Sequence, residues 1–332
     1  MKPKMKTILT AVLLLFLLTG CASKTQPAEQ NTGHLKITAA VFPAWDWARN
    51  ILGENPSGAE LTLLTDSGVD LHSYQPSVDD ILTISNSDLF IYVGGESDRW
   101  VSDALKQAAN PDMHIISMLG TLGDAAMQEE LAEGMQAETE DEEAEDNGPE
   151  YDEHVWLSLR NAEILCNAVT AELSALDSAN AGTYSENNEA YLQKLRELDR
   201  AYQDVISGSP IKTLLFGDRF PFRYLTEDYG LNYYAAFSGC SAETEATFET
   251  ISFLARKTDE LDMPAVLTID VSDRRIAQTI VQNTADPSRP ILTLDSMQAV
   301  SAKDIQNGTT YLSVMEKNLE VLKQALSREE PK

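Results

Sequence analysis

Four side chains in this sequence are of the types that bind divalent metal ions, and each follows a stretch with the pattern of a β-strand. His72 follows the second such stretch, Asp218 the fifth and Asp295 the eighth, while His154 comes after the fourth by way of an acidic segment. In open α/β sheets, ligands bind beyond the carboxyl ends of the strands, so these groups should meet in one cleft. Imidazole nitrogens favour Zn²⁺ and carboxylate oxygens favour Mn²⁺. The sequence therefore predicts a transition-metal site, with zinc as the first candidate and manganese as the second.

Two further polar residues lie beside these positions. Arg219 directly follows Asp218, and Asp270 ends the seventh predicted strand. We expect Asp270 either to orient a metal ligand or to pair with Arg219. The remaining histidines are not expected to bind metal, because His34 borders a polar stretch and His114 begins a strand.

The segment over residues 128–153 contains thirteen Asp or Glu residues and no Lys or Arg. Such a density of like charge repels itself and cannot form a core, which predicts an exposed, mobile loop. His154 lies where this loop gives way to a helix with apolar residues at helical spacing. A histidine beneath an anionic segment suits the capture of a cation, although a solvated charge run beside a helix-start histidine would have the same pattern.

The elements that must position these residues alternate between short apolar strands and helices. This alternation predicts an α/β fold of two lobes, each with a four-stranded, mainly parallel sheet flanked by helices. The amino-terminal lobe is expected over residues 35–180 and the carboxy-terminal lobe over residues 208–330. The predicted strands are residues 36–41, 60–65, 89–93, 114–118, 212–216, 232–237, 265–269 and 291–294.

One long connecting helix is predicted between the lobes, over residues 181–207. Its apolar stripe recurs at the helical period and includes Tyr184, Tyr191, Leu195 and Tyr202. At 1.5 Å per residue such a helix is about 35 Å long, which is enough to run beside both lobes. A single stiff connection predicts only a small hinge motion.

The first 34 residues have the pattern of an export signal followed by a tether. Three lysines precede an apolar run that is too short to span a bilayer, which predicts a signal peptide over residues 1–20. Cys21 follows small residues where cleavage is expected, as in bacterial lipoproteins, and is the predicted lipidation site. Residues 21–34 are polar and rich in turn formers, so we expect them to hold a monomeric, folded part outside the cell membrane.

The charge and the cysteines narrow the possible partners. The formal net charge of −28 repels nucleic acid and attracts cations. After Cys21 the chain retains Cys166 and Cys240. Because Cys166 lies on a predicted helix and Cys240 follows a distant strand, no disulfide between them is expected.

Several segments, in this order, resemble motifs of the substrate-binding lipoproteins of zinc- and manganese-type ABC transporters. Residues 38–50 resemble the opening strand and helix of that family, and HSYQPS at residues 72–77 resembles its first histidine motif. The glycine-rich turn and the acidic-x-Trp helix are matched by residues 94–100, and the second histidine motif by EHVWL at residues 153–157. The last motif, in which an aspartate closes the site, is matched by TLD at residues 293–295.

The resemblance covers nearly the whole chain after the tether. It implies two α/β lobes joined by a long helix, with one metal ion in the cleft as cargo. It also implies delivery of that ion to a membrane permease and its ATPase, and therefore a receptor rather than an enzyme.

The third motif of that family departs from its pattern in this chain. Family members carry a histidine or a glutamate near the start of a segment that continues to Tyr-Gly-Leu, and here the matching position is Arg219. Arginine stays protonated and has no lone pair to offer a metal. Asp218 is the first candidate to take over the role. Water or Cys240 are alternatives, and Arg219 would otherwise bind an anion that accompanies the metal.

Three other functions remain open at this point. Arg219 would suit a receptor for a metal chelate or an anionic metal complex. The altered third motif is also compatible with an adhesion or interaction lipoprotein that kept the scaffold but lost the site. A metal-dependent hydrolase is least favoured, because the sequence lacks HExxH, GxSxG and a dense cluster of carboxylates and histidines.

Overall fold

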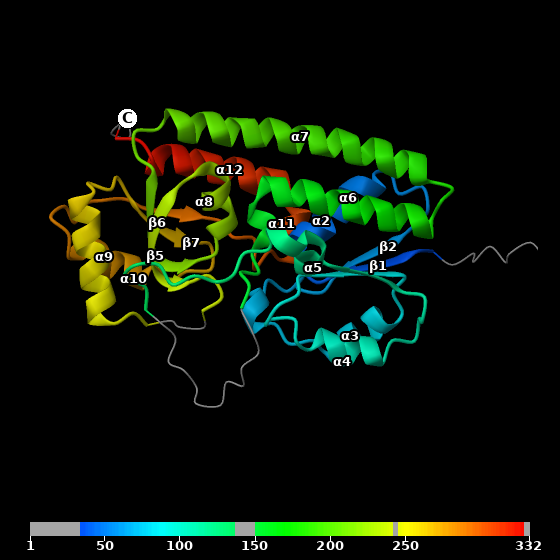
Figure 1. Ribbon diagram of the computed structural model, residues 1–332. Coiled ribbons are helices and arrows are strands. Elements are labelled where there is room, and N and C mark those ends of the chain that lie inside the picture. Colours follow the sequence, from blue (N-terminus) through cyan, green and yellow to red (C-terminus); the bar gives the residue numbers. More distant parts are fainter. Residues whose placement is uncertain (1–33, 137–149, 242–244, 329–332) are drawn as a thin grey trace, which may run out of the picture. The chain divides into compact units, whose positions relative to one another are not determined.

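The computed structural model of the protein describes residues 34–136, 150–241 and 245–328 (Figure 1). The predicted signal peptide, Cys21 and residues 22–33 lie outside this part of the chain, as do residues 137–149 of the acidic segment. Among the described helices, none combines the length and the hydrophobicity that crossing a membrane requires. Two four-stranded sheets with parallel pairing organise the described residues and confirm the predicted fold class.

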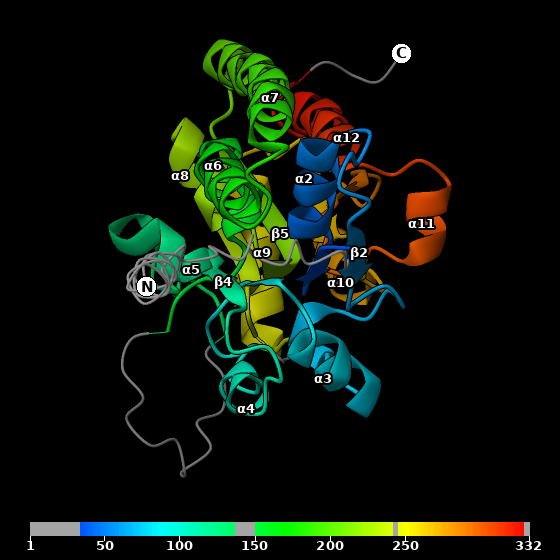
Figure 2. The ribbon, with the colours of Figure 1, turned by 90° about the vertical axis from the view of Figure 1, so that its right-hand side faces the viewer.

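The sheet of the amino-terminal lobe has the strand order β2-β1-β3-β4. Helices α2 and α6 cover one of its faces, while α3 and α4 lie on the other (Figure 2). Coverage on both faces explains why consecutive residues of its central strands β1 and β3 are buried, rather than every second one. The strands are β1 (Lys36–Ala39), β2 (Glu60–Leu63), β3 (Leu89–Tyr92) and β4 (His114–Ser117). The helices are α2 (Phe42–Leu52), α3 (Val78–Ser85), α4 (Val101–Lys106), α5 (Met118–Leu122) and α6 (Leu159–Leu176).

The sheet of the carboxy-terminal lobe repeats this arrangement with the order β6-β5-β7-β8. Helices α9 and α10 pack against β5, and α12 packs against β8. The strands are β5 (Thr213–Phe220), β6 (Asn232–Ser238), β7 (Val266–Ile269) and β8 (Ile291–Leu294). The helices are α8 (Arg223–Tyr229), α9 (Phe248–Glu260), α10 (Arg275–Gln282), α11 (Ala302–Gln306) and α12 (Tyr311–Ala325).

Helix α7 (Ala181–Gly208) connects the two lobes and contacts both. It packs against α2 and α6 of the first lobe and against α8 and α12 of the second (Figure 1). Its predicted stripe is buried, including Tyr184, Tyr191, Leu195 and Tyr202. The hydroxyl of Tyr202 donates to the Met315 carbonyl at 2.6 Å. The helix therefore joins the hydrophobic cores of both lobes.

Buried hydrogen bonds also join the lobes directly. The hydroxyl of Tyr311, at the start of α12, donates to the Trp156 carbonyl at 2.6 Å, and its backbone N–H donates to Asp46 Oδ2 at 3.0 Å. The Trp156 indole N–H donates to the Ser296 carbonyl at 2.9 Å. Wide separation of the lobes would break these bonds in a dry environment, which is costly.

Two sequence expectations are wrong in detail. Asp218 and Arg219 do not follow β5 but lie within it, because β5 continues to Phe220 through a register shift after Phe216. Asp152 and Glu153 were expected in an exposed loop, yet their exposed fractions are 0% and 1%. The described start of the acidic segment also contacts the second lobe, where Gln136 N–H donates to the Ala236 carbonyl at 2.9 Å.

Candidate metal centre

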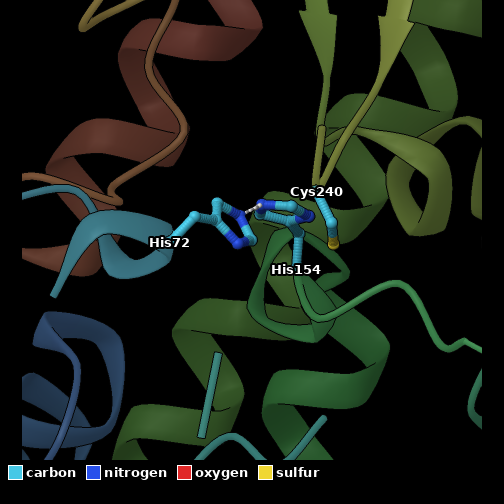
Figure 3. Close-up of side chains that lie close together, drawn as sticks. All are labelled: His72, His154 and Cys240. Carbon is cyan, nitrogen blue, oxygen red and sulfur yellow. Dashed lines mark hydrogen bonds between the residues drawn. The ribbon is translucent and has the colours of Figure 1, made fainter. Parts of the chain in front are cut away.

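Two short 3-10 turns present the histidines of the first lobe. His72 lies in the turn Leu71–Ser73 after β2, and Ser77 begins α3 with a capping box, as its position before an apolar run suggests. His154 immediately precedes the turn Val155–Leu157, and Ser158 caps α6. The Nε2 atoms of the two imidazoles lie 3.0 Å apart and point toward each other (Figure 3). Residues separated by 82 positions in the chain are thus brought into one site.

The Nδ1 atom of each imidazole is held by a polar neighbour. His72 Nδ1 lies 2.8 Å from Ser97 Oγ, and His154 Nδ1 lies 2.9 Å from Asp152 Oδ1. Asp152 Oδ1 also accepts the backbone N–H of His154 at 2.8 Å. Metal-binding histidines are typically oriented in this way by a hydroxyl or carboxylate on the other ring nitrogen. Both Nε2 atoms are therefore the ones placed to bind an ion.

The protonation of the pair follows from its surroundings. Burial, followed by the neighbouring His154, lowers the pKa of His72 to about 3. Burial acts to lower the pKa of His154 as well, but the carboxylates of Asp152, Glu129 and Glu153 outweigh it and raise that pKa above its ordinary value. The surroundings thus favour protonation of His154 over His72, and a single proton lies between the facing Nε2 atoms. A metal ion would take the place of that single proton between the rings.

Cys240 is the third member of the cluster. The ligand atoms of His72, His154 and Cys240 all lie within 4.8 Å of one another, and Figure 3 shows the thiol beside the His154 ring. Among the described residues, these three are the His, Cys, Asp or Glu side chains that lie close enough together to hold a metal ion. Burial, and then the carboxylates of Asp152 and Glu129, raise the pKa of the Cys240 thiol well above its usual value.

Asp218 and Arg219 lie at a cavity that adjoins this cluster. The cavity has a volume of about 450 Å³, and its lining includes Asp70, His72, Asp218, Arg219, Asp273 and Arg275. Arg219 donates to Asp70 Oδ2 at 2.6 Å, and both side chains are 15% exposed. Asp218 accepts the Arg219 backbone N–H at 2.9 Å and lies outside the histidine cluster. Arg219 thus pairs across the lobes with Asp70 instead of with Asp270.

Asp270 and Asp295 are held by the loop that follows β8. Asp270 Oδ1 accepts the backbone N–H and the hydroxyl of Ser296, both at 2.7 Å. Asp295 Oδ1 accepts the Met297 N–H at 2.9 Å. Burial, followed by the Asp270 carboxylate, raises the pKa of Asp295 to about 7. The structure does not bring either carboxylate into the histidine cluster, so their binding of metal stays a prediction.

The family of the protein follows from a comparison with known proteins. Residues 37–325 match the model of the ZnuA family, described as the periplasmic component A of a zinc-uptake complex. The chain belongs to the ZnuA family. This confirms the family resemblance on which the sequence motifs converge.

Related proteins carry names that refer to zinc. The zinc-binding lipoprotein AdcA of Streptococcus pneumoniae is 27% identical over 326 residues, which cover 98% of this chain and 62% of AdcA. The high-affinity zinc uptake system protein ZnuA of Bacillus subtilis is 24% identical, and the match covers 96% of each chain. The crystal structure of the Zn(II)-bound ZnuA-like domain of S. pneumoniae AdcA superposes with a TM-score of 0.68 at 25% identity, covering 89% of this chain and 99% of that one. The chain spans about 62% of the length of the AdcA proteins that it matches.

Sequence reasoning missed the groups that support the two histidines in this ZnuA-family chain. Glu153 Oε1 accepts the Ser97 N–H at 2.8 Å, and its other oxygen lies 3.6 Å from His72 Nδ1. Gly95 has a φ of +84°, and a Cβ there would lie 2.5 Å from Glu153 Oε1. The spacing of Asp152 and Glu153 next to His154 was the available signal, but the charge run around them favoured an exposed assignment.

Proposed function

We propose that this protein is an extracytoplasmic receptor that captures a zinc ion between His72 and His154 and passes it to an ABC transporter permease. Membership of the ZnuA family and the zinc-binding relatives support this role. The observation that carries the proposal is the opposed pair of Nε2 atoms at 3.0 Å, each on a ring whose Nδ1 is already held. Such a receptor needs no bond chemistry, so we propose no enzymatic activity.

The geometry of the pair is close to that of a zinc site before its ion enters. Zinc–nitrogen distances of 2.0–2.1 Å and a tetrahedral angle place two ligand nitrogens about 3.3 Å apart. The rings therefore need to separate by only a few tenths of an ångström. Because their orientation is already set by Ser97 and Asp152, little side-chain entropy is lost on binding. Manganese is the second candidate, since oxygen ligands would have to supply the rest of its shell.

The acidic segment is proposed to raise the local concentration of cations. Its described part is fixed to the second lobe by Glu129, which accepts the Cys240 N–H at 2.8 Å, and by Glu130, which pairs with Arg223 at 3.1 Å. The segment therefore begins next to the cluster. A negative field at the mouth of a cleft attracts cations and speeds their association.

Anchoring and delivery complete the proposed role. Lipid on Cys21 and the tether over residues 21–34 would hold the two lobes near a permease and its ATPase at the outer face of the membrane. Removal of residues 1–20 as a signal peptide belongs to the same proposal. The zinc-uptake description of the family supports a transporter partner in general terms.

A calorimetric zinc titration tests the proposal. The wild-type chain should bind one Zn²⁺, and His72→Ala and His154→Ala should each weaken binding by more than about 100-fold, because loss of a ligand exceeds the 10–100-fold typical of an orienting residue. His114→Ala is the matched control, since His114 pairs with Glu172 outside the cluster. Equal zinc affinity in all four proteins would refute the proposal.

The same titration distinguishes a receptor for bare Zn²⁺ from the alternative, a receptor for an anionic zinc chelate. Arg219 and Arg275 line the adjoining cavity, but their positive charges are matched by Asp70 and Asp273. We therefore expect bare Zn²⁺ to bind in preference to an anionic zinc chelate. Tight binding of zinc citrate with no binding of bare zinc would favour the alternative.

A further inference from the structure

The two imidazoles leave a tetrahedral ion short of protein ligands, and Cys240 is the other side chain of the cluster that can bind a metal. In a tetrahedral site with Zn–N near 2.05 Å and Zn–S near 2.3 Å, the sulfur lies about 3.6 Å from each nitrogen. The Sγ of Cys240 lies within 4.8 Å of one ring nitrogen of each histidine. A shift of at most about 1.2 Å would bring it to the spacing that such a site requires.

The backbone holds Cys240 at this place for reasons visible in its neighbours. Cys240 follows β6 after Gly239, and a Cβ on Gly239 would lie 3.1 Å from His154 Nδ1 and 2.9 Å from the Phe220 carbonyl oxygen. Glycine thus permits the close approach of this turn to the imidazole. The Cys240 N–H is also fixed by Glu129 Oε1 at 2.8 Å.

Arg219 explains why a ligand from a different strand is needed. Its guanidinium cannot coordinate a cation, and it pairs with Asp70, whose Oδ1 accepts the backbone N–H of His72 at 2.9 Å. β5 therefore supports the His72 turn from the second lobe without donating to the ion. The turn after the neighbouring strand β6 then offers Cys240, which lies in the cluster with the two imidazoles.

We propose that Cys240 binds the captured ion as a thiolate, completing a His72–His154–Cys240 site that selects zinc and similar thiophilic cations over manganese. The inference rests on the proposed zinc-receptor function and specifies its ligand set. On binding, the Cys240 thiol loses its proton to solvent and its sulfur forms the third bond to the ion. Thiolate is a soft ligand that Zn²⁺ accepts readily, whereas Mn²⁺ prefers oxygen. Because the histidines come from the first lobe and Cys240 from the second, the ion would also join the lobes.

Cobalt substitution in the full chain tests this assignment directly. All proteins carry Cys21→Ser, so that Cys166 and Cys240 are the remaining thiols. Bound Co²⁺ should show a thiolate-to-cobalt charge-transfer band in the near ultraviolet, and Cys240→Ser should abolish it. Cys166→Ser is the matched control, since Cys166 is buried in α6 away from the cluster, and should keep the band.

Affinities and alkylation make the test decisive. Cys240→Ser should weaken zinc binding by more than about 100-fold and change manganese affinity by less than about threefold. The reason is that zinc uses the lost thiolate ligand and manganese does not. In the chain that retains Cys240, zinc should protect this thiol from iodoacetamide, a readout that does not depend on how well the serine variant folds. Unchanged zinc affinity in Cys240→Ser, with no thiolate band and no protection, would overturn the inference while leaving the receptor function intact. Failure of that function would show itself differently, as absent zinc binding in the parent protein.

Discussion

In the first lobe, Asp152 and Glu153 turn their carboxylates toward the two imidazoles, whereas in the second lobe Asp270 and Asp295 turn theirs toward their own loop. The sheets of the two lobes share one topology, but Asp152 and Glu153 are buried, whereas Asp295 is half-buried and Asp270 is exposed. The difference lies in what each carboxylate contacts. In the first lobe the carboxylates contact imidazole nitrogens as well as backbone N–H groups, and in the second they accept backbone or hydroxyl donors of residues 296–297. A carboxylate at a strand end is therefore available to an ion only if its loop does not already use it.

The largest effect is expected on the free energy of unfolding and concerns Asp98. This residue accepts hydrogen bonds from the glycine turn that contacts Glu153. Its Oδ2 accepts the N–H groups of Val93 and Gly94 at 2.9 Å, and burial raises its pKa to about 6. Between pH 4 and 6 the folded chain holds this proton more tightly than the unfolded chain, so stability falls as pH rises, by up to about 3 kcal/mol. Measured by urea denaturation, the stability of Asp98→Asn should not decrease between pH 4 and 6 in this way. Asp103→Asn, at an exposed site, should show the same decrease as the wild type. A wild-type slope in Asp98→Asn would contradict the expectation.

The next largest effect is expected on zinc affinity and comes from the role of Asp152 in orienting His154. Asp152→Ala should weaken zinc binding by about 10–100-fold, because the His154 ring loses its partner at Nδ1. Asp152→Asn retains an acceptor oxygen and should recover most of that affinity. Calorimetry on both variants measures the difference. If alanine and asparagine were equally damaging, the charge of Asp152 rather than its position would be what matters.

The ion pair between Arg219 and Asp70 tests how the second lobe supports the first. A double-mutant cycle with Arg219→Met and Asp70→Asn should give a coupling of about 1–2 kcal/mol in chemical denaturation, since both groups are largely buried. The exposed pair of Lys106 and Asp103 is the control and should give less than about 0.5 kcal/mol. A coupling near zero for Arg219 and Asp70 would mean that this contact does not hold the lobes together.

The smallest effect is expected for Asp295, and it bears most directly on the comparison of the lobes. Asp295→Asn should change zinc affinity by less than about threefold, because its carboxylate is engaged with Met297 outside the cluster. The amide retains an oxygen that can accept the same N–H. A loss of more than about 100-fold would show that Asp295 is a ligand after all, as the sequence motif suggests.

The apolar runs and the chemistry of the two histidines were sufficient to predict much of this protein. All eight strands, the long helix between the lobes and the turn that carries His72 could be anticipated, because burial on both faces and helical periodicity leave a local pattern. The family was likewise evident from short motifs around His72 and His154.

The tertiary structure decided which polar groups face the proposed metal site. Asp152 and Glu153 belong to a charge run that looks solvated, yet they are buried, with one oxygen of each hydrogen-bonded to His154 or to Ser97. Cys240 looked like a small buried residue until the turn after β6 was folded against His154. Sequence determines which side chains are able to donate, but hydrogen bonding between distant segments determines which of them remain free to do so.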